Sequence, residues 1–381
     1  MARAEPPLRV DPEPAGDDDE HPHLASHRPV AAGHVLLVML AGLLLGAFLN
    51  ADRMAERAEQ KSFDDPWRGP SVALWGGLEA VADAVGLTRP RQAIEGALGP
   101  DHPGSSDADV EDLVDQRSAR AAARQDAPPT IRTPSAARPL RLYLGGDSMA
   151  RSFGIALQRV AGTTGIITPT IDHRVVSGLS RPDYFNWPQH LAEDVVATDP
   201  EVMVLLFGAN DAQSLRLDDG TICRRFERCW IEEYRRRVAG TMDLLRDPDG
   251  DRIVVWLGQP IMGPASGVDH VDLLNAIYEA QAEERPWVRY VDTWSWFVQP
   301  DGSYSAFLPA ADGSEHRVRE PDDVHLTAAG GERLSWALLR LLGDGIVDLS
   351  AWAGEPPPDA LPPDRPRPRT DLPDPEPRLV D

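Results

Sequence analysis

The sequence is poor in cysteine, in lysine and in basic side chains generally. The shortage of basic side chains argues against nucleic acids as partners. It contains 2 cysteines and a single lysine, Lys61, and its 38 basic residues stand against 61 acidic ones, which gives a net charge of −23. Proteins that bind nucleic acids draw most of their affinity from arginine and lysine side chains that neutralise phosphates. The charge balance therefore argues against a nucleic-acid partner.

Motifs for metals and cofactors are also missing. No HExxH, phosphate-binding loop or dinucleotide fingerprint occurs in the required context, so no metal and no cofactor is implied. The two cysteines, Cys223 and Cys229, lie close together, with no histidine or further cysteine between them to suggest a zinc site. They form a small disulfide loop if the domain lies in an oxidising compartment, and remain two unpaired thiols otherwise.

One uncharged apolar run is present, near the N-terminus. Residues 35–49 are VLLVMLAGLLLGAFL, and with its neighbours the segment 34–51 approaches the ~20 residues that a helix needs to cross a bilayer. Residues 1–33 form an acidic arm that we predict to be disordered. This arm differs from the short basic start of a cleaved signal peptide, the main alternative, so we predict a retained transmembrane anchor.

The charges that flank the anchor conflict with the rest of the sequence over its orientation. Arg28 precedes the apolar run, whereas Arg53, Arg57, Lys61 and Arg68 follow it, and the positive-inside rule would place the following domain inside. The cysteine pair and the length of the following domain favour the outside. We expect a single-pass protein whose large domain is extracytoplasmic.

Composition divides the rest of the chain into a connector, a folded domain and a tail. Residues 52–138 form a connector or stalk, in which 71–87 has the apolar spacing of a helix that lies on the membrane or packs against the domain. Residues 346–381 form a proline-rich tail that we predict to be disordered and extended. Residues 139–345 remain as the single folded domain.

Within this domain, short β-branched runs alternate with longer amphipathic stretches. Strands are predicted at 140–146, 165–171, 201–208, 252–258 and 288–294, and helices at about 149–161, 188–198, 231–246, 270–284 and 327–342. This alternation predicts an α/β fold, a three-layer α/β/α sandwich with a mostly parallel sheet of about five strands. Ligands of such folds bind beyond the carboxyl ends of the strands.

A serine lies where the first predicted strand meets the first predicted helix of the domain. The strand ends in Gly145-Gly146-Asp147-Ser148, and the helix pattern begins at once. A backbone amide at a helix N-terminus can hold a developing oxyanion. Aspartate and serine are also common helix caps, however, so this motif alone is more typical of an ordinary helix start.

Three further features supply a base and amide donors. Asp322 precedes His325 by three residues before the last helix, and a carboxylate at that spacing can fix the tautomer of an imidazole. Asn210 follows the strand 201–208, so its amide can donate to an oxyanion at the same sheet edge. Gly178 lies in a loop, where the lack of a Cβ lets a backbone amide approach closely. Each also has a structural interpretation as a turn or cap residue.

Together the motifs occur in the order Gly-Asp-Ser, Gly, Gly-x-Asn-Asp and Asp-x-x-His, and this ordered set resembles the GDSL/SGNH hydrolase superfamily. Segments such as RPDYFNWP and DDVHLTAAGG are similar to a membrane-anchored bacterial branch of unassigned function. The resemblance implies a flavodoxin-like SGNH fold with Ser148 as nucleophile, His325 as general base and Asp322 as its orienting group. It also implies an oxyanion hole formed by Ser148, Gly178 and Asn210.

We expect from these motifs a serine esterase that hydrolyses an O-acyl ester, such as O-acetyl, on a cell-envelope glycan. The alternatives are an O-acyltransferase that uses the same triad with a partner, and a non-catalytic envelope scaffold. The expected partners are the acylated substrate and the membrane. Residues proposed to line the substrate pocket are Asp147, Tyr184, Phe185, Trp187, Asp211 and Gln259.

Overall fold

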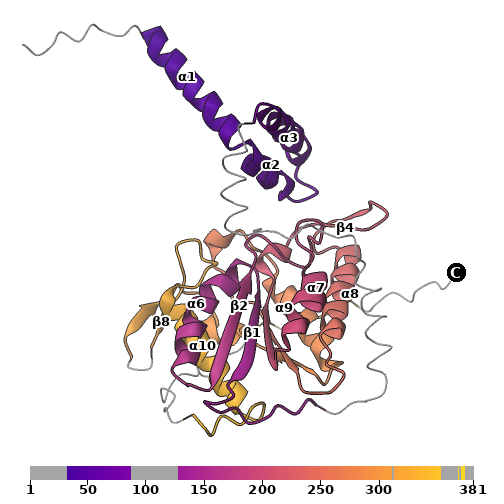
Figure 1. Ribbon diagram of the computed structural model, residues 1–381, viewed down its shortest axis with the longest axis vertical. Coiled ribbons are helices and arrows are strands. Elements are labelled where there is room, and N and C mark those ends of the chain that lie inside the picture. The colour runs from indigo at the N-terminus through magenta and orange to yellow at the C-terminus, as the bar shows by residue number, and fades with distance from the viewer. Residues whose placement is uncertain (1–31, 87–127, 311–312, 353–367, 369, 374–381) are drawn as a thin grey trace, which may run out of the picture.

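The computed structural model describes residues 32–86, 128–310, 313–352, 368 and 370–373 (Figure 1). The predicted disordered arm, 1–33, lies outside the described residues except for its last two. Much of the predicted stalk and of the proline-rich tail is also outside them.

A five-stranded parallel sheet forms the centre of the domain. Its strand order is β2-β1-β3-β6-β7. Every residue of β3 and β6 is buried, as is typical of a parallel sheet that is covered on both faces. The strand bounds are Leu140–Gly146 for β1, Ile167–His173 for β2, Val202–Leu206 for β3, Ile253–Leu257 for β6 and Val288–Val291 for β7.

Helices cover both faces of the sheet, and the predicted three-layer α/β/α fold is confirmed (Figure 1). On one face α6 and α10 pack over the side chains of Leu142 and Leu144. On the other face α7, α8 and α9 enclose Met203 and Leu205. The helix bounds are Ser148–Gly162 for α6, Trp187–His190 for α7, Arg228–Leu244 for α8, Val271–Glu283 for α9 and Ala328–Gly343 for α10.

The helix predicted at 188–198 is not a single α-helix. After α7 the chain continues as a π-helix, Leu191–Val195, and a 3-10 turn, Val196–Thr198. Asp199 then adopts a left-handed conformation, φ 55°, which ends the helical run. The β-branched residues at its C-terminal end lose side-chain freedom in an α-helix, which weakens the regular form there.

Several small elements were not predicted. The strands β4 (Leu215–Arg216) and β5 (Ile222–Cys223) form one hairpin, and β8 (Phe307–Pro309) and β9 (Glu315–Arg317) form another. The disulfide between Cys223 and Cys229, which the sequence analysis predicts for an oxidising compartment, joins β5 to the start of α8. Three further 3-10 turns span Ala209–Asp211, Pro264–Ser266 and Trp294–Phe297. Part of the tail lies on the domain, where Arg235 donates to the Pro373 carbonyl at 3.1 Å.

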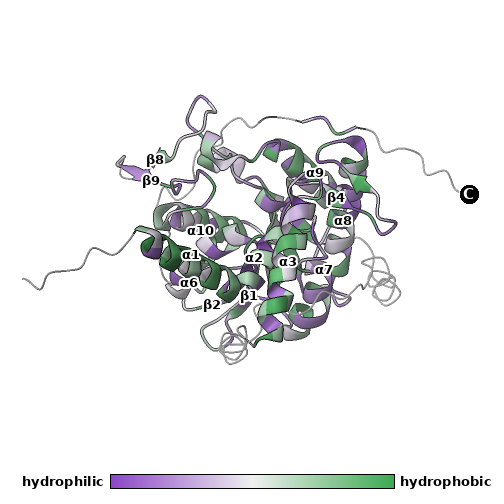
Figure 2. Cartoon of the chain, turned by 90° about the horizontal axis from the view of Figure 1, so that it is seen from above, coloured by the Kyte–Doolittle hydropathy of each residue, from purple (hydrophilic) through white to green (hydrophobic). Residues whose placement is uncertain are grey.

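The N-terminal region contains a long apolar helix and a shorter helical hairpin. Helix α1, Ala32–Leu49, has a mean hydropathy of 2.3 and no buried residue, so it is long and apolar enough to cross a membrane. Figure 2 shows its hydrophobic character along its length. Helices α2 (Ala51–Glu59) and α3 (Arg68–Ala84) pack together as a hairpin. This α2–α3 hairpin lies between α1 and the sheet domain (Figure 1).

Candidate active site

Ser148 is the first residue of α6 and follows β1 through a tight turn. Asp147 caps the helix, and its carboxylate accepts a hydrogen bond from the Met149 amide at 2.8 Å. Gly146 has a φ of 152°, and a Cβ added to it would lie 2.1 Å from the carbonyl oxygen of Leu206 in β3. Only glycine allows β1 and β3 to approach so closely at this point. The turn thereby places Ser148 at the carboxyl end of the sheet.

The side chains of Ser148, His325 and Asp322 form a continuous hydrogen-bonded chain. The Ser148 Oγ lies 2.8 Å from the His325 Nε2, and the His325 Nδ1 lies 2.7 Å from the Asp322 Oδ2. Because a carboxylate only accepts, Nδ1 carries the proton and Nε2 is free to accept from the serine. Burial alone would raise the pKa of Asp322, but hydrogen bonds from His325 and from the Val324 amide hold it below its ordinary value.

The loop that carries Asp322 and His325 is held by a buried arginine that the sequence analysis did not single out. Arg319 is 0% exposed, and its guanidinium donates to the carbonyls of Val324 at 2.6 Å and Ile261 at 2.8 Å. Burial lowers the pKa of Arg319 to about 10, so it remains protonated at neutral pH. Arg319 thus ties the loop backbone just before the histidine to the segment that carries Ile261.

Asn210 and Gly178 lie on neighbouring loops at the same sheet edge. The Asn210 side-chain amide donates to the Asp147 Oδ2 at 3.3 Å, which holds it beside the residue that precedes Ser148. A Cβ at Gly178 would lie 2.2 Å from the Asp211 Oδ1, so only glycine fits there. The same Asp211 oxygen accepts from the Ser180 amide at 2.7 Å. Asp211 therefore fixes the Gly178 loop beside the segment that carries Asn210.

A pocket of about 680 Å³ opens beside the Ser148 hydroxyl. Ile155, Val175 and Val176 give it an apolar wall, and these side chains are between 39% and 69% exposed. Ile155 lies on the solvent-facing side of α6, so an apolar residue in that otherwise polar stripe is a signal that the sequence analysis passed over. The residues that line this pocket include Ser148, Arg151, Ile155, Val176, Asn210 and His325.

The residues predicted to line the pocket lie elsewhere among the described residues. Phe185, Trp187 and Gln259 are at most 1% exposed, and they pack in the core behind the site. Trp187 donates to the Ser177 hydroxyl at 2.8 Å, and Gln259 donates to the Phe207 carbonyl. These three assignments were wrong. Phe185 and Trp187 fill space in the hydrophobic core, and Gln259 provides a hydrogen-bond donor for a buried backbone carbonyl.

The other three predicted lining residues have structural contacts instead. Asp147 and Asp211 are both 0% exposed and are bonded to loop amides, so they shape the site from beneath. Tyr184 is half-buried, and its hydroxyl contacts Glu56 of α2 at 3.3 Å. It does not line the serine pocket itself, but it lines a neighbouring pocket that shares Arg151, Val175 and Val176 with it. Within the described residues, no group of three or more His, Cys, Asp and Glu side chains could hold a metal ion.

The buried Asp147 predicts an unusual dependence of stability on pH. Burial is the largest influence and raises the pKa of Asp147 to about 7, although the Met149 amide lowers it. Between about pH 4 and 7 the folded protein therefore binds a proton that the unfolded chain has released, so stability falls as the pH rises through this window. We expect Asp147→Asn to remove this loss, which amounts to about 1.4 kcal/mol per pH unit at most.

The measurement is urea unfolding of both proteins, followed by tryptophan fluorescence at pH 5, 6, 7 and 8. Asp199→Asn is the matched control, since its carboxylate is 76% exposed. If wild type and Asp147→Asn give parallel stability profiles, the buried carboxyl does not titrate in this range.

Comparison with known proteins places the chain in one family. Residues 141–340, just over half of the chain, match the family described as "Protein of unknown function (DUF459)". No curated protein matches the sequence.

Solved structures with similar folds are distant in sequence. A lipase/acylhydrolase from Enterococcus faecalis is 15% identical, covering 54% of this chain and 96% of that one, with a TM-score of 0.36. A carbohydrate acetylesterase from Sinorhizobium meliloti is 14% identical, with 54% and 99% covered and a TM-score of 0.37. The catalytic domain of peptidoglycan O-acetyltransferase A from Streptococcus pneumoniae is 14% identical, with 54% and 94% covered and a TM-score of 0.33. The chain belongs to the DUF459 family, and its ordered motifs resemble those of the GDSL/SGNH hydrolase superfamily.

Proposed function

We propose that the protein is a serine esterase that cleaves O-acyl esters. The observation that carries this proposal is the hydrogen-bonded chain from Ser148 through His325 to Asp322, at 2.8 and 2.7 Å. His325 Nε2 takes the hydroxyl proton while Ser148 Oγ attacks the acyl carbonyl. The protonated imidazole then gives its proton to the departing alcohol, and an acyl-serine remains. Water, deprotonated by His325, attacks this ester and releases the carboxylic acid and the free serine.

Amide donors near the serine are suited to the negative charge that develops on the carbonyl oxygen. We assign this role to the backbone amides of Ser148 and Gly178 and to the side-chain amide of Asn210. The Ser148 amide lies at the N-terminus of α6, where the helix dipole also favours negative charge. Asp147 holds Asn210, and Asp211 holds the Gly178 loop, so the donors are fixed before a substrate arrives.

The pocket suggests the class of ester. Ile155, Val175 and Val176 form an apolar surface for the acyl group, whereas the open side of the pocket faces solvent. The Arg151 side chain lines the same pocket and has no ion-pair partner among the described residues, so it can contact a polar or anionic alcohol portion. We propose a short acyl group, such as acetyl, on a cell-envelope glycan.

We also propose that α1 is a membrane anchor and that the sheet domain lies outside the cytoplasm. The length and apolar character of α1 support the anchor. The Cys223–Cys229 disulfide supports the outside placement, because disulfides persist in oxidising compartments. The cations that follow α1 still favour the opposite orientation. Cysteine accessibility labelling on intact cells, with probes placed before and after α1, tests this assignment.

Hydrolysis is favoured over acyl transfer because water can reach the site. The His325 side chain is 35% exposed and the Asp322 side chain 49% exposed. The test is to give the full-length protein an acetylated envelope oligosaccharide, together with an unacetylated acceptor, and to analyse the products. Free acetate supports hydrolysis, whereas acetylated acceptor without free acetate would assign acyl transfer.

A fluorophosphonate probe distinguishes an enzyme from a scaffold that only retains the fold. Such probes form a covalent bond with an activated serine, so we expect labelling of Ser148 that peptide mass spectrometry locates. Folded protein that remains unlabelled at Ser148 would contradict the proposed catalytic role.

A further inference from the structure

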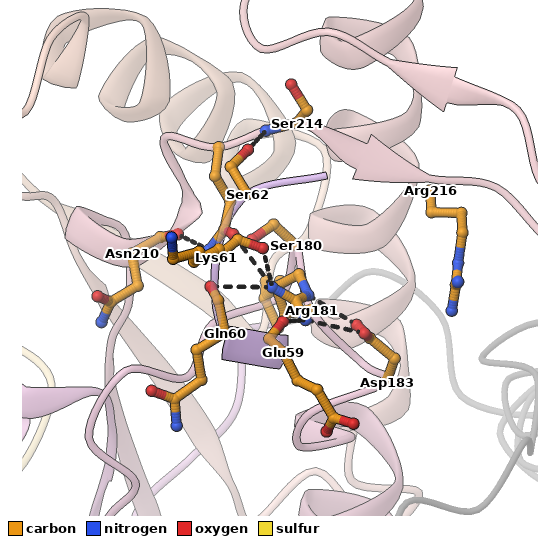
Figure 3. Close-up of polar contacts among 12 residues, drawn as sticks. Glu59, Gln60, Lys61, Ser62, Ser180, Arg181, Asp183, Asn210, Ser214 and Arg216 are labelled. Atoms are coloured by element: carbon orange, nitrogen blue, oxygen red, sulfur yellow. Dashed lines mark hydrogen bonds and ion pairs between the residues drawn. The ribbon is translucent and has the colours of Figure 1, made fainter. Parts of the chain in front are cut away.

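A buried arginine, Arg181, contacts both the α2–α3 hairpin and the sheet domain. This residue is 3% exposed and lies three residues after Gly178. Its guanidinium forms a two-point ion pair with Asp183, at 2.8 and 2.9 Å. Figure 3 shows the remaining donors directed toward the chain that follows α2. Arg181 thus connects a site loop to the juxtamembrane segment.

The groups that accept from Arg181 are backbone carbonyls at the C-terminal end of α2. Its Nη2 donates to Glu59 O at 2.7 Å, and its Nη1 to Gln60 O at 3.2 Å and Lys61 O at 3.4 Å. The last carbonyls of a helix have no partner inside the helix, and they carry its negative dipole end. A planar guanidinium can satisfy several of them at once, which the single ammonium of a lysine cannot do equally well.

Further contacts seat the hairpin at this place. The ring of Phe63, just beyond α2, lies under the guanidinium groups of Arg181 at 4.6 Å and Arg216 at 5.0 Å. The Ser214 amide donates to the Ser62 hydroxyl at 3.3 Å. The hairpin is therefore held by contacts with two separate loops of the domain, 180–184 and 213–216.

Both of these loops lead to proposed oxyanion donors. On one side, Gly178 and Arg181 share a short loop, and the Ser180 amide between them is bound to Asp211. On the other side, the Arg181 Nη1 lies 3.4 Å from the Gln213 Oε1, and the Gln213 Nε2 donates to the Asn210 carbonyl at 2.6 Å. The same guanidinium therefore contacts the hairpin, the Gly178 loop and, through Gln213, the backbone of Asn210.

We propose that Arg181 is a positioning residue that couples the docked α2–α3 hairpin to the oxyanion donors Gly178 and Asn210. The juxtamembrane hairpin then forms part of the scaffold of the site as well as its link to α1. This inference rests on the proposed function for its catalytic consequence, whereas the docking itself rests on the contacts alone.

The test uses the full-length protein in detergent micelles and two readouts. The first is kcat and KM for a short-chain nitrophenyl ester, and the second is hydrogen exchange of peptides that cover 52–63 and 174–181. Loss of a single oxyanion donor costs about 10²- to 10³-fold in kcat. Because displacement is a smaller change than loss, we expect Arg181→Ala to lower kcat by about 10- to 100-fold. KM should change little, because the donors act in the transition state.

Three comparison variants separate the links of the network. Arg181→Lys should recover part of kcat. Gln213→Ala should lower kcat while the exchange protection of 52–63 stays intact, because it breaks only the link to Asn210. Arg141→Ala is the matched control. Like Arg181, Arg141 pairs with an aspartate and donates to a backbone carbonyl, in this case both of Asp199. Arg141 lies near the N-terminal end of β1, however, whereas Ser148 follows the C-terminal end of that strand. Arg141→Ala should leave both readouts at wild-type values.

The outcomes distinguish this inference from the proposed function. Wild-type kcat in Arg181→Ala, with the protection of 52–63 lost, would overturn the coupling while the esterase remains. If the wild-type protein neither hydrolyses the ester nor labels with fluorophosphonate, the proposed function fails, and exchange alone decides the coupling. Faster exchange over 174–181 in Arg181→Ala then supports it, and unchanged exchange overturns it. Should Arg181→Ala not fold, Arg181→Lys and Gln213→Ala provide the same comparison.

Discussion

Replacement of Ser148 by alanine is expected to lower kcat/KM for a short-chain nitrophenyl ester by about 10⁴- to 10⁶-fold, the scale on which triad serines act. The Ser148 hydroxyl lies 2.8 Å from the His325 Nε2, and alanine leaves no nucleophile at that place. The loss should appear in kcat, because acylation cannot occur. Initial rates at saturating and subsaturating ester, corrected for hydrolysis in buffer, measure it.

Stability should be almost unchanged in Ser148→Ala, since the side chain contributes one hydrogen bond at a partly exposed site. Substitutions of this kind usually change the free energy of unfolding by less than about 1 kcal/mol. Ser335→Ala is the matched control: this serine also lies in a helix, where its hydroxyl donates to the Gly331 carbonyl at 2.7 Å, but it is buried in α10. Wild-type rates in folded Ser148→Ala would exclude Ser148 as nucleophile.

Asp322→Asn is expected to lower kcat by about 10³- to 10⁴-fold, the second largest effect. The Asp322 Oδ1 accepts from the amides of Val324 at 3.0 Å and His325 at 2.9 Å. An asparagine oxygen can retain these two bonds, so the loop should keep its conformation. Its NH2 group would then face His325 Nδ1, which must accept instead of donate. The proton moves to Nε2, and the imidazole can no longer take the proton of the serine.

Asp323→Asn provides the matched comparison for this change. The Asp323 carboxylate accepts from the Tyr304 hydroxyl at 2.7 Å and from the Ala265 amide at 3.0 Å, and not from the imidazole. Its backbone φ is 60°, a conformation that asparagine adopts readily. We expect a far smaller loss of kcat in Asp323→Asn. Equal losses in the two variants would mean that loop stability, and not the histidine tautomer, decides the rate.

The sheet and the order of its helices could be predicted because the relevant signals are local. β-branched runs such as 202–206 identify buried strands, and the residues at each strand end must lie on the same edge of a parallel sheet. The proximity of Ser148, Asn210 and His325 follows from that topology. The ordered motifs then supply the chemistry, although each alone is also typical of an ordinary turn or cap.

The pocket wall and the hairpin contacts could not be predicted in the same way. Phe185 and Trp187 follow the Gly178 loop as subsite aromatics would, but their direction depends on the packing of α7 against β3, which no local pattern records. The bond from Arg181 to Gln60 joins residues 121 positions apart in the sequence. Its acceptor is a backbone carbonyl, which every residue possesses and no motif marks.

The junction between α1 and α2 bears on where the proposed serine site can lie relative to a membrane. Only Asn50 separates the two helices, and its side chain donates to the Gly46 carbonyl at 2.8 Å, so the junction is short and bonded. With α1 in a bilayer and α2 docked on the domain, the serine would stay at a nearly constant height above the lipid surface. The serine site would then diffuse in two dimensions, parallel to the membrane, and not in three. Which esters it meets would depend on their depth in the envelope more than on their bulk concentration.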